Sequence, residues 1–160
     1  MTEARALAGL AEIPHRVVRH GPVGSLEEAA AARGVPTAAV VKTLVVRRGD
    51  GDYLFVLVPG DRQISWPKLR ALLGVSRMSL PDAADALAAT GYERGTITPF
   101  GSTTAWPVVA DAAMVGQEVS LGAGAHGVAV VLQADDAIAA LAAQVADVTS
   151  PATTAPPATR

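Results

Sequence analysis

The spacing of hydrophobic and polar positions along the chain predicts five helices and several strands. An alanine-rich segment that stops at Pro14 predicts a helix over residues 2–13. Ser25 begins a capping-box pattern, and the alanine-rich helix that follows it ends at Gly34. Further helices are predicted at residues 65–74, 81–89 and 134–145.

Two apolar segments, at residues 40–47 and 53–58, give the strongest strand signal in the chain. Residues 49–52 between them read Gly-Asp-Gly-Asp, which is typical of a tight turn, so this region predicts a β-hairpin. Because helices alternate with hairpins, the pattern predicts a mixed α/β sheet rather than a strictly parallel one. Shorter strands are expected at residues 16–20, 76–79, 96–98, 108–110, 118–121 and 128–133.

The length of 160 residues corresponds to one domain of about 150 residues with a short appendage. We expect the domain to span residues 1–148. From Thr149 onward the sequence is rich in proline, threonine and alanine and has too little apolar surface to bury. Residues 149–160 are therefore expected to form a disordered tail.

Composition excludes several kinds of chemistry. The chain has no cysteine, so it has no disulfide, thiolate nucleophile or zinc–thiolate site. A net charge of −2 gives no chain-wide attraction for nucleic acid, so any such contact must be local, and DNA is not an expected partner. No apolar run approaches the roughly 20 residues that span a bilayer, and the N-terminus does not read as a signal peptide. These features predict a soluble cytoplasmic protein without membrane contact.

Familiar catalytic and cofactor motifs are missing. Residues 122–127 match G-x-G-x-x-G, but an apolar strand follows them where a dinucleotide-binding motif has a helix, so they favour a glycine-rich hairpin. The chain has no H-E-x-x-H, G-x-S-x-G or Walker A sequence. His15, His20 and His126 are too dispersed to indicate a metal site, and none is assigned.

Two segments carry candidate chemistry. Lys42 lies within the apolar run at residues 40–46, where alternation places its ammonium on the side of Val40, Leu44 and Val46. This lysine either extends along the strand to reach water or stands at the mouth of a cleft, where it would hold a phosphate or a carbonyl oxygen. The glycine-rich residues 91–101 form either a simple tight loop or one whose backbone approaches a ligand closely.

Together these segments resemble the YbaK/EbsC family of aminoacyl-tRNA deacylases, which shares a fold with the editing insertion of bacterial prolyl-tRNA synthetases. The resemblance implies a mixed, mostly antiparallel, curved sheet flanked by helices. It also implies hydrolysis of the ester that joins a wrong amino acid to the terminal adenosine of tRNA. This reaction needs no metal or organic cofactor, since an ester is already activated. The resemblance covers about residues 15–145 and is carried by VVKTLVV at 40–46, LVPGD at 57–61, TGYERGTITPFG at 90–101, VVAD at 108–111 and GAGAHGVAVVLQADD at 122–136.

The resemblance implies which residues act. Lys42, in the K-T-L segment, and Gly95, the first glycine of a G-x-x-x-P loop, would be central to catalysis. The Lys42 ammonium or backbone N–H would hold the substrate carbonyl or the terminal phosphate, while the Gly95 carbonyl orients the water or a ribose hydroxyl. A hydroxyl of the substrate would assist as the general base. The expected substrate-binding residues are His20 at the pocket entrance, Thr43, Pro99, Phe100, Gly101, Asp111 and His126.

The chain departs from the branch of the family that clears cysteine from prolyl-tRNA. In that branch an aromatic residue, an acidic residue and a histidine stand where this chain has Val18, Arg19 and His20. The branch also has an acidic residue where this chain has Ala129. Both differences remove polarity. Cysteine, alanine, serine and threonine are therefore all open as the amino acid, on tRNA-Pro or a similar tRNA.

The expected partners are the acceptor end of an aminoacyl-tRNA and an aminoacyl-tRNA synthetase. The alternative function is a non-catalytic module that binds a small molecule or the end of a tRNA and regulates another process. A small-molecule esterase is a weaker alternative, because the chain lacks a nucleophile elbow. A local basic group either contacts the acceptor stem or forms a solvated face, and its members are Arg47, Arg48, Lys68 and Arg70.

Overall fold

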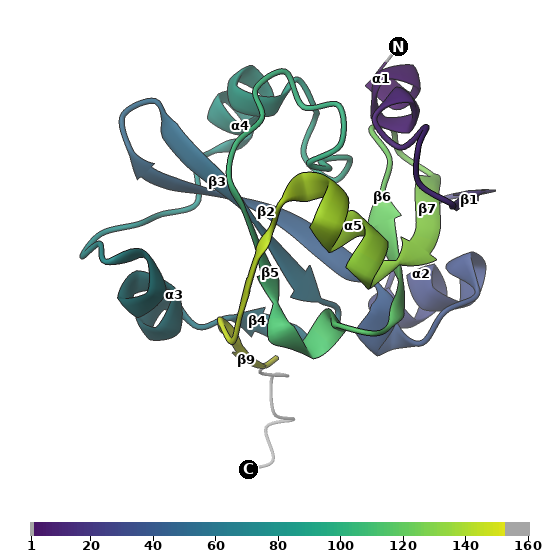
Figure 1. Cartoon of the computed structure of the whole chain (residues 1–160). Coiled ribbons are helices and arrows are strands. Elements are labelled where there is room, and N and C mark those ends of the chain that lie inside the picture. Colours follow the sequence, from purple (N-terminus) through teal and green to yellow (C-terminus); the bar gives the residue numbers. More distant parts are fainter. Residues whose placement is uncertain (1, 153–160) are drawn as a thin grey trace.

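The computed structural model describes residues 2–152, in which helices surround a set of short sheets (Figure 1). The mixed α/β class expected from the sequence is confirmed. Within the described residues no helix is both long and apolar enough to cross a membrane. The helices are α1 (Thr2–Ala8), α2 (Leu26–Arg33), α3 (Trp66–Leu73), α4 (Ala83–Thr90) and α5 (Ala134–Leu141), with 3-10 turns η1 (Thr37–Ala39) and η2 (Ala112–Met114). The strands are β1 (Arg16–Arg19), β2 (Val41–Gly49), β3 (Asp52–Pro59), β4 (Arg62–Ile64), β5 (Val108–Asp111), β6 (Glu118–Gly122), β7 (Val128–Gln133), β8 (Gln144–Ala146) and β9 (Thr149–Pro151).

Within the described residues the strands are divided among three sheets rather than one. The first has the order β2-β3-β5-β8, with β2 and β3 antiparallel and the other two pairs parallel. The second is the antiparallel sheet β1-β7-β6, and the third pairs β4 with β9 in antiparallel fashion. A bridge between Val40 and Ser120 joins the first sheet to the second. Antiparallel pairs predominate, as predicted.

The two faces of β2 pack against different parts of the molecule. Figure 1 shows the long β2–β3 hairpin crossing the molecule, with β6 and β7 beside one end. Val45 belongs to a core cluster shared with α2, β6 and β7, whereas Val46 belongs to a second cluster shared with α3. Because successive side chains of a strand point to opposite faces, Thr43 faces the first cluster. Lys42 faces the second, on the side of Leu44 and Val46, as the alternation predicted. The same prediction is wrong for Val40, which belongs to the first cluster because it precedes the strand and bridges to Ser120.

Side-chain caps at Ser25, Ser65 and Asp82 begin three helices where the sequence predicts them. The Oγ of Ser25 accepts a hydrogen bond from the backbone N–H of Glu28 at 3.1 Å, and α2 ends at Gly34, whose φ of 74° suits glycine. The carboxylate of Asp82 accepts a hydrogen bond from the backbone N–H of Asp85 at 2.8 Å. This cap fixes the start of α4.

The first and last helices are shorter than predicted. α1 ends at Ala8, and Gly9 then passes so close to the loop at Gly101 that a Cβ on Gly9 would lie 2.9 Å from the Gly101 nitrogen. α5 ends at Leu141, because Ala142 turns the backbone with a φ of 51°. The residues that follow form β8, which pairs with β5. In both places tertiary contacts override local helix propensity.

Two short predicted strands are wrong. Residues 76–79 form no strand, and Ser79 alone bridges to Arg47. Residues 96–98 lie in a loop, where the backbone N–H of Thr96 donates to the carbonyl of Glu93 at 2.9 Å instead of to a neighbouring strand. The three-residue strand β4 was not predicted, because three residues are too few to show a periodic pattern.

The predicted boundary between the domain and its tail is also wrong. Residues Thr149–Pro151 form β9, which pairs with β4, and Thr149 is fully buried. Ala152 adds a backbone hydrogen bond to the carbonyl of Asp61 at 3.0 Å. Strand pairing, which composition does not reveal, therefore holds this segment in the fold. The rest of the predicted tail, residues 153–160, lies outside the described residues.

Candidate functional site

One edge of β2 lacks a partner strand over its central residues. β3 pairs with one side of β2, and on the other side the described residues provide only a single bridge near each end of the strand. At one of these bridges Arg47 and Ser79 exchange backbone hydrogen bonds of 2.8 and 3.1 Å, so the backbone N–H and C=O of Arg47 face outward, away from β3. Because peptide groups alternate in direction along a strand, those of Val45 and Thr43 face outward too. We call residues 41–46 on this side the open edge.

A cavity of about 450 Å³ lies along the open edge. Its volume falls in the range of small-molecule sites. Most of the surrounding side chains are apolar, and within residues 2–152 no three His, Asp or Glu side chains are arranged to hold a metal ion. The wall consists of residues 40–45, residues 80–83 and Ala86 at the start of α4, and Arg33, Arg94, Gly95, Ile97 and Gly122.

Lys42 contributes to the wall of the cavity, but its ammonium is directed toward β4. The Nζ atom donates a hydrogen bond to the backbone carbonyl of Arg62 at 3.1 Å. Burial lowers the pKa of Lys42, and the negative charge of Asp61 opposes that shift. The side chain as a whole is exposed, so the ammonium can leave the Arg62 carbonyl without disturbing the core.

The glycine-rich loop presents Gly95 to the cavity and brings it against His126. Gly95 has a φ of 89°, a left-handed conformation that residues with a Cβ rarely adopt. A Cβ on Gly95 would lie 3.3 Å from the Cε1 atom and 3.8 Å from the Nδ1 atom of His126. His126 is exposed in the loop between β6 and β7. The fold thus brings together two residues that the sequence analysis predicted as site residues from two different motifs.

Thr43 and Arg33 bring unsatisfied polar atoms to the wall. The Oγ1 of Thr43 and the Nε of Arg33 are buried and have no hydrogen-bond partner among the described residues. The Nη1 of Arg33 donates to the Oγ of Ser120 at 3.2 Å, and burial lowers the pKa of this guanidinium. Buried polar groups without partners are uncommon in proteins, so this wall is suited to a ligand that supplies the missing bonds.

Arg33 was not among the residues that the sequence singled out. It ends an alanine-rich helix, where a basic residue is expected from the helix dipole alone. No local signal distinguishes it, because its partner Ser120 comes from a distant strand. Arg94, which also lines the cavity, lies in the loop motif that carried the resemblance, next to Gly95.

Hydrogen bonds anchor the second half of the glycine-rich loop. Residues 99–101 are not in the wall of this cavity, and the first of them lines a second cavity of about 520 Å³. The Nε of Arg5 donates to the carbonyl of Gly101 and the hydroxyl of Tyr92 donates to the carbonyl of Phe100, both at 2.6 Å. These bonds hold the loop against α1 and so fix the half that faces the cavity.

His20 and Asp111 also lie outside the cavity wall. The backbone N–H of His20 donates to the carbonyl of Gly127 at 2.9 Å, and its buried Nε2 has no partner among the described residues. The buried carboxylate of Asp111 accepts backbone hydrogen bonds from Ala113 and Val148, both at 3.1 Å. His20 therefore supports the β6–β7 loop, and the bonds of Asp111 are structural.

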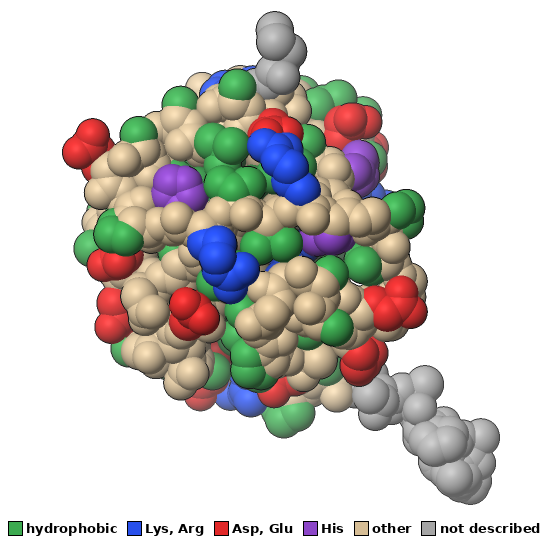
Figure 2. Space-filling view, turned by 90° about the vertical axis from the view of Figure 1, so that its right-hand side faces the viewer, with side chains coloured by type: hydrophobic (Ala, Val, Ile, Leu, Met, Phe, Trp, Pro, Cys, Tyr) green, Lys and Arg blue, Asp and Glu red, His purple; other side chains and the backbone are tan. Residues whose placement is uncertain are grey.

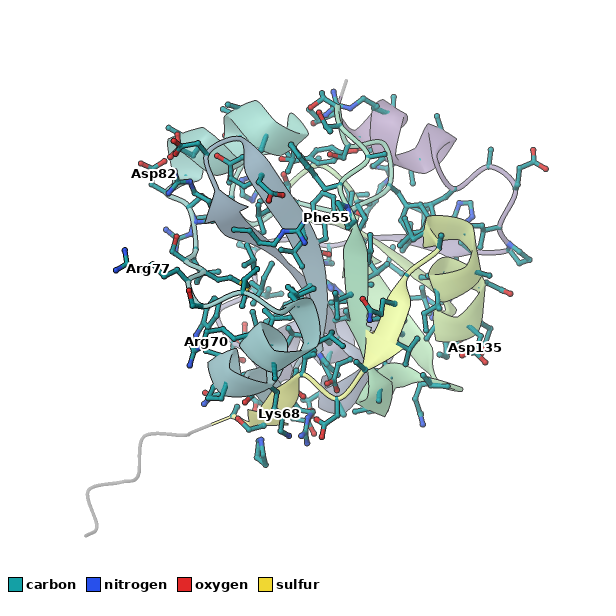
Figure 3. The ribbon with its side chains drawn as sticks, turned by 60° about the vertical axis from the view of Figure 1, so that its left-hand side comes forward. Phe55, Lys68, Arg70, Arg77, Asp82 and Asp135 are labelled. Atoms are coloured by element: carbon teal, nitrogen blue, oxygen red, sulfur yellow. The ribbon has the colours of Figure 1, made fainter. Side chains whose placement is uncertain are left out.

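The local basic group does not form a free patch. Three of its members have a carboxylate partner, in the ion pairs Arg47–Asp50, Arg48–Asp52 and Lys68–Asp147. Figure 3 shows Lys68 and Arg70 projecting from the outer side of α3. Figure 2 shows the other side of the molecule, where basic, acidic and hydrophobic side chains are also interspersed. This arrangement is typical of a solvated surface.

Comparisons with known proteins agree on one family. A family model described as the aminoacyl-tRNA editing domain matches residues 20–140. The chain is 40% identical over 92 residues to a proline–tRNA ligase of Desulfovibrio desulfuricans, which covers 58% of this chain and 16% of the ligase. It is 35% identical over 111 residues to a proline–tRNA ligase of Nitratidesulfovibrio vulgaris, which covers 69% of this chain and 18% of the ligase. The chain thus matches less than a fifth of the length of these relatives.

Solved structures share the fold over nearly the whole chain. The crystal structure of a candidate trans-editing enzyme for prolyl-tRNA synthetase matches with a TM-score of 0.85 and 25% identity, covering 93% of this chain and 97% of that one. The crystal structure of a hypothetical protein matches with a TM-score of 0.81 and 25% identity, covering 92% and 99%. Since the family model spans well over half of its length, the chain belongs to the family of aminoacyl-tRNA editing domains.

Proposed function

We propose that the chain is a deacylase that acts in trans on mischarged aminoacyl-tRNA. The bond cleaved is the ester between a small amino acid, such as cysteine, alanine, serine or threonine, and the terminal ribose of tRNA-Pro or a similar tRNA. The observation that carries the proposal is the cavity between the open edge and Gly95, in a member of an editing family. We place the activity in the cytoplasm, where tRNA is charged.

The open edge suits the first step of ester hydrolysis. When water adds to the ester carbon, the carbonyl oxygen gains negative charge, and N–H groups held in place by the fold stabilise it with little reorganisation. The outward N–H groups of Thr43 and Val45 are held in this way by the strand. Lys42 adds a positive charge once its ammonium exchanges the Arg62 carbonyl for the substrate.

Gly95 supplies the carbonyl that positions the water or a ribose hydroxyl, and its missing side chain lets the terminal ribose approach. The water oxygen bonds to the ester carbon, and the bond from that carbon to the ribose oxygen breaks. The proton released by the water passes through a substrate hydroxyl to the departing ribose oxygen. Positioning and charge stabilisation suffice for an activated ester, in keeping with a chain that has no cysteine.

The cavity suits a small amino acid. Its wall carries the valine side chains of the open edge and the short residues at the start of α4. The carboxylate of Asp82 is used in capping α4, so it is not a free acid in the site. Thr43 and His126 contact the substrate in this proposal, while His20, Phe100 and Gly101 position the two loops.

A deacylation panel tests the proposal. tRNA-Pro and several other tRNAs, each charged with cysteine, alanine, serine, threonine or the cognate amino acid, are incubated with the full chain, and release of the amino acid is followed. We expect faster release of one or more small amino acids, and loss of that activity in a Lys42→Ala protein whose fold is verified by circular dichroism. Binding of charged tRNA without faster release would indicate the non-catalytic module instead.

The proposal includes a synthetase as partner, because the matching segment is a small part of the proline–tRNA ligases. In a reaction in trans the charged tRNA must be brought to the cavity, and a synthetase that binds this tRNA would bring it there. We therefore expect added prolyl-tRNA synthetase to raise the rate of deacylation at low concentrations of charged tRNA. An unchanged rate would remove the synthetase from the proposal but leave the deacylase.

A further inference from the structure

We propose that Arg33 binds the phosphate that precedes the terminal nucleoside of the substrate. The inference rests on the proposed function for the identity of the ligand. Its structural basis is a partly buried guanidinium in the cavity wall that has no carboxylate partner among the described residues. The terminal phosphate was assigned from the sequence to Lys42 as one of two options, and the geometry points to a different cation.

No carboxylate within residues 2–152 compensates the charge of Arg33. Its Nη1 donates to the neutral hydroxyl of Ser120, and its buried Nε has no partner among the described residues. The single carboxylate in the described cavity wall, that of Asp82, caps α4. Burial lowers the pKa of Arg33, and no acidic neighbour opposes this shift. A partly buried cation without an acid is unfavourable by itself, and an anionic ligand would remove that cost.

The chemistry of the substrate selects the phosphate. In the terminal part of an aminoacyl-tRNA the ester is neutral and the α-ammonium is positive, so a guanidinium would repel the amino acid. The anion nearest to the ester is the phosphate joining the last two nucleotides. A guanidinium presents a planar fork of N–H donors that fits two phosphate oxygens at once.

The other cations of the cavity are less suited to this role. The ammonium of Lys42 is bonded to the Arg62 carbonyl, on the face of β2 that carries the second core cluster. Arg94 is exposed, so fixing its side chain on a ligand would cost more conformational entropy. The hydrogen bond to Ser120 already holds Arg33 in the wall, which reduces the entropy lost on binding.

Binding of adenosine monophosphate and of adenosine to the full chain tests the assignment, because the two ligands differ only in the phosphate. By calorimetry we expect the unaltered chain to bind the monophosphate at least about tenfold more tightly than adenosine. In Arg33→Gln the two affinities should become equal while that for adenosine is unchanged. Arg33→Lys should retain part of the difference, because a lysine keeps the charge without the fork. Arg70→Gln, which removes a charge from α3, is the matched control and should retain all of it.

Three results with adenosine monophosphate and adenosine would overturn the assignment. They are equal affinities for the two ligands in the unaltered chain, an undiminished difference in a folded Arg33→Gln or Arg33→Lys protein, and loss of the difference in Arg94→Gln alone. Inorganic phosphate that binds as tightly as adenosine monophosphate would also overturn it, since the site would then be one for free phosphate. If the chain deacylates charged tRNA but does not prefer the monophosphate over adenosine, this inference alone is refuted. If the preference depends on Arg33 but the chain does not deacylate charged tRNA, the proposed function alone is refuted.

Discussion

The imidazole of His126 lies 3.3 Å from the position that a Cβ atom on Gly95 would occupy. The two residues belong to different loops, one between α4 and β5 and the other between β6 and β7. Gly95 lines the cavity along the open edge, whereas His126 is not among the residues of its wall. A side chain at position 95 would therefore press on the imidazole of His126.

We expect Gly95→Ala to lower deacylation by more than about tenfold, equivalent to roughly 1.4 kcal/mol of transition-state stabilisation. The added methyl group obstructs the ribose and presses on His126. Because Gly95 has a positive φ, alanine at this position should also lower the free energy of unfolding by about 1 kcal/mol, the cost of a left-handed conformation for a residue with a Cβ. Turnover of charged tRNA and urea denaturation measure the two effects separately.

Gly51→Ala is the control for this backbone strain. Gly51 has a φ of 66° in the β2–β3 turn, and no atom of residues 2–152 outside the turn lies within 4 Å of a Cβ placed on it. Its replacement should lower stability by a similar amount and leave turnover unchanged. Wild-type turnover in a folded Gly95→Ala protein would contradict the proposed site.

The hydroxyl of Thr43 should serve function at the expense of stability. We expect Thr43→Val to raise the free energy of unfolding by about 1 kcal/mol, because it removes a buried hydroxyl that has no partner in the described structure. Turnover should fall if that hydroxyl binds the substrate. Ser102→Ala is the matched control, because Ser102 also has a buried hydroxyl without a described partner but is not in the cavity wall. Stabilisation by both changes with equal turnover would remove Thr43 from the site.

The lowered pKa of Lys42 predicts how stability depends on pH. In the folded protein this lysine loses its proton at a lower pH than in the unfolded chain, whose reference pKa is 10.5. The unfolded chain therefore binds more protons between the lowered pKa and that reference value. Across this window the free energy of unfolding of the wild type, relative to Lys42→Met, should rise as the pH increases.

Urea denaturation of both proteins at a series of alkaline pH values measures this difference. Burial raises the pKa of Tyr92 above its reference value of 10.0, so this tyrosine destabilises the fold as the pH rises past 10.0, but both proteins share it and its effect cancels. A difference that falls with pH would mean that the Lys42 ammonium is stabilised by the fold.

Strand β9 should be required for stability although it lies in a segment of low complexity. The Nε of Arg62 donates to the Oγ1 of Thr149 at 2.5 Å, and the Nζ of Lys68 donates to the Thr149 carbonyl at 2.9 Å. A chain ended after Val148 loses both bonds, and hydrogen bonds to charged groups contribute about 1.5–3 kcal/mol each. We expect it to be less stable by about 2 kcal/mol or more.

A chain ended after Ala152 is the matched control for this truncation. It keeps β9 and its bonds, so its Tm and its turnover should equal those of the full chain. Equal stability of the two truncated chains would show that β9 is dispensable.

The sequence by itself determined features that depend on neighbouring residues. Strand alternation placed Lys42 on the side of Leu44 and Val46, and the capping pattern placed the start of α2 at Ser25. These predictions succeed because a strand repeats every two residues and a helix cap acts within one turn. The motif around Gly95 also led to the family and to a residue in the cavity wall.

Only the tertiary structure decided how the cavity is built. The open edge exists because no strand of the described part of the chain pairs with the outer side of β2 between its two bridges, and pairing is a relation between distant segments. Arg33 became a candidate only when the fold set it against Ser120, 87 residues away along the chain. Thr149 was read as tail because its composition is unfavourable, yet pairing with β4 and bonds from Arg62 hold it in the core. Local patterns record propensity, whereas the burial of a charge or the pairing of an edge depends on which distant residues the fold brings together.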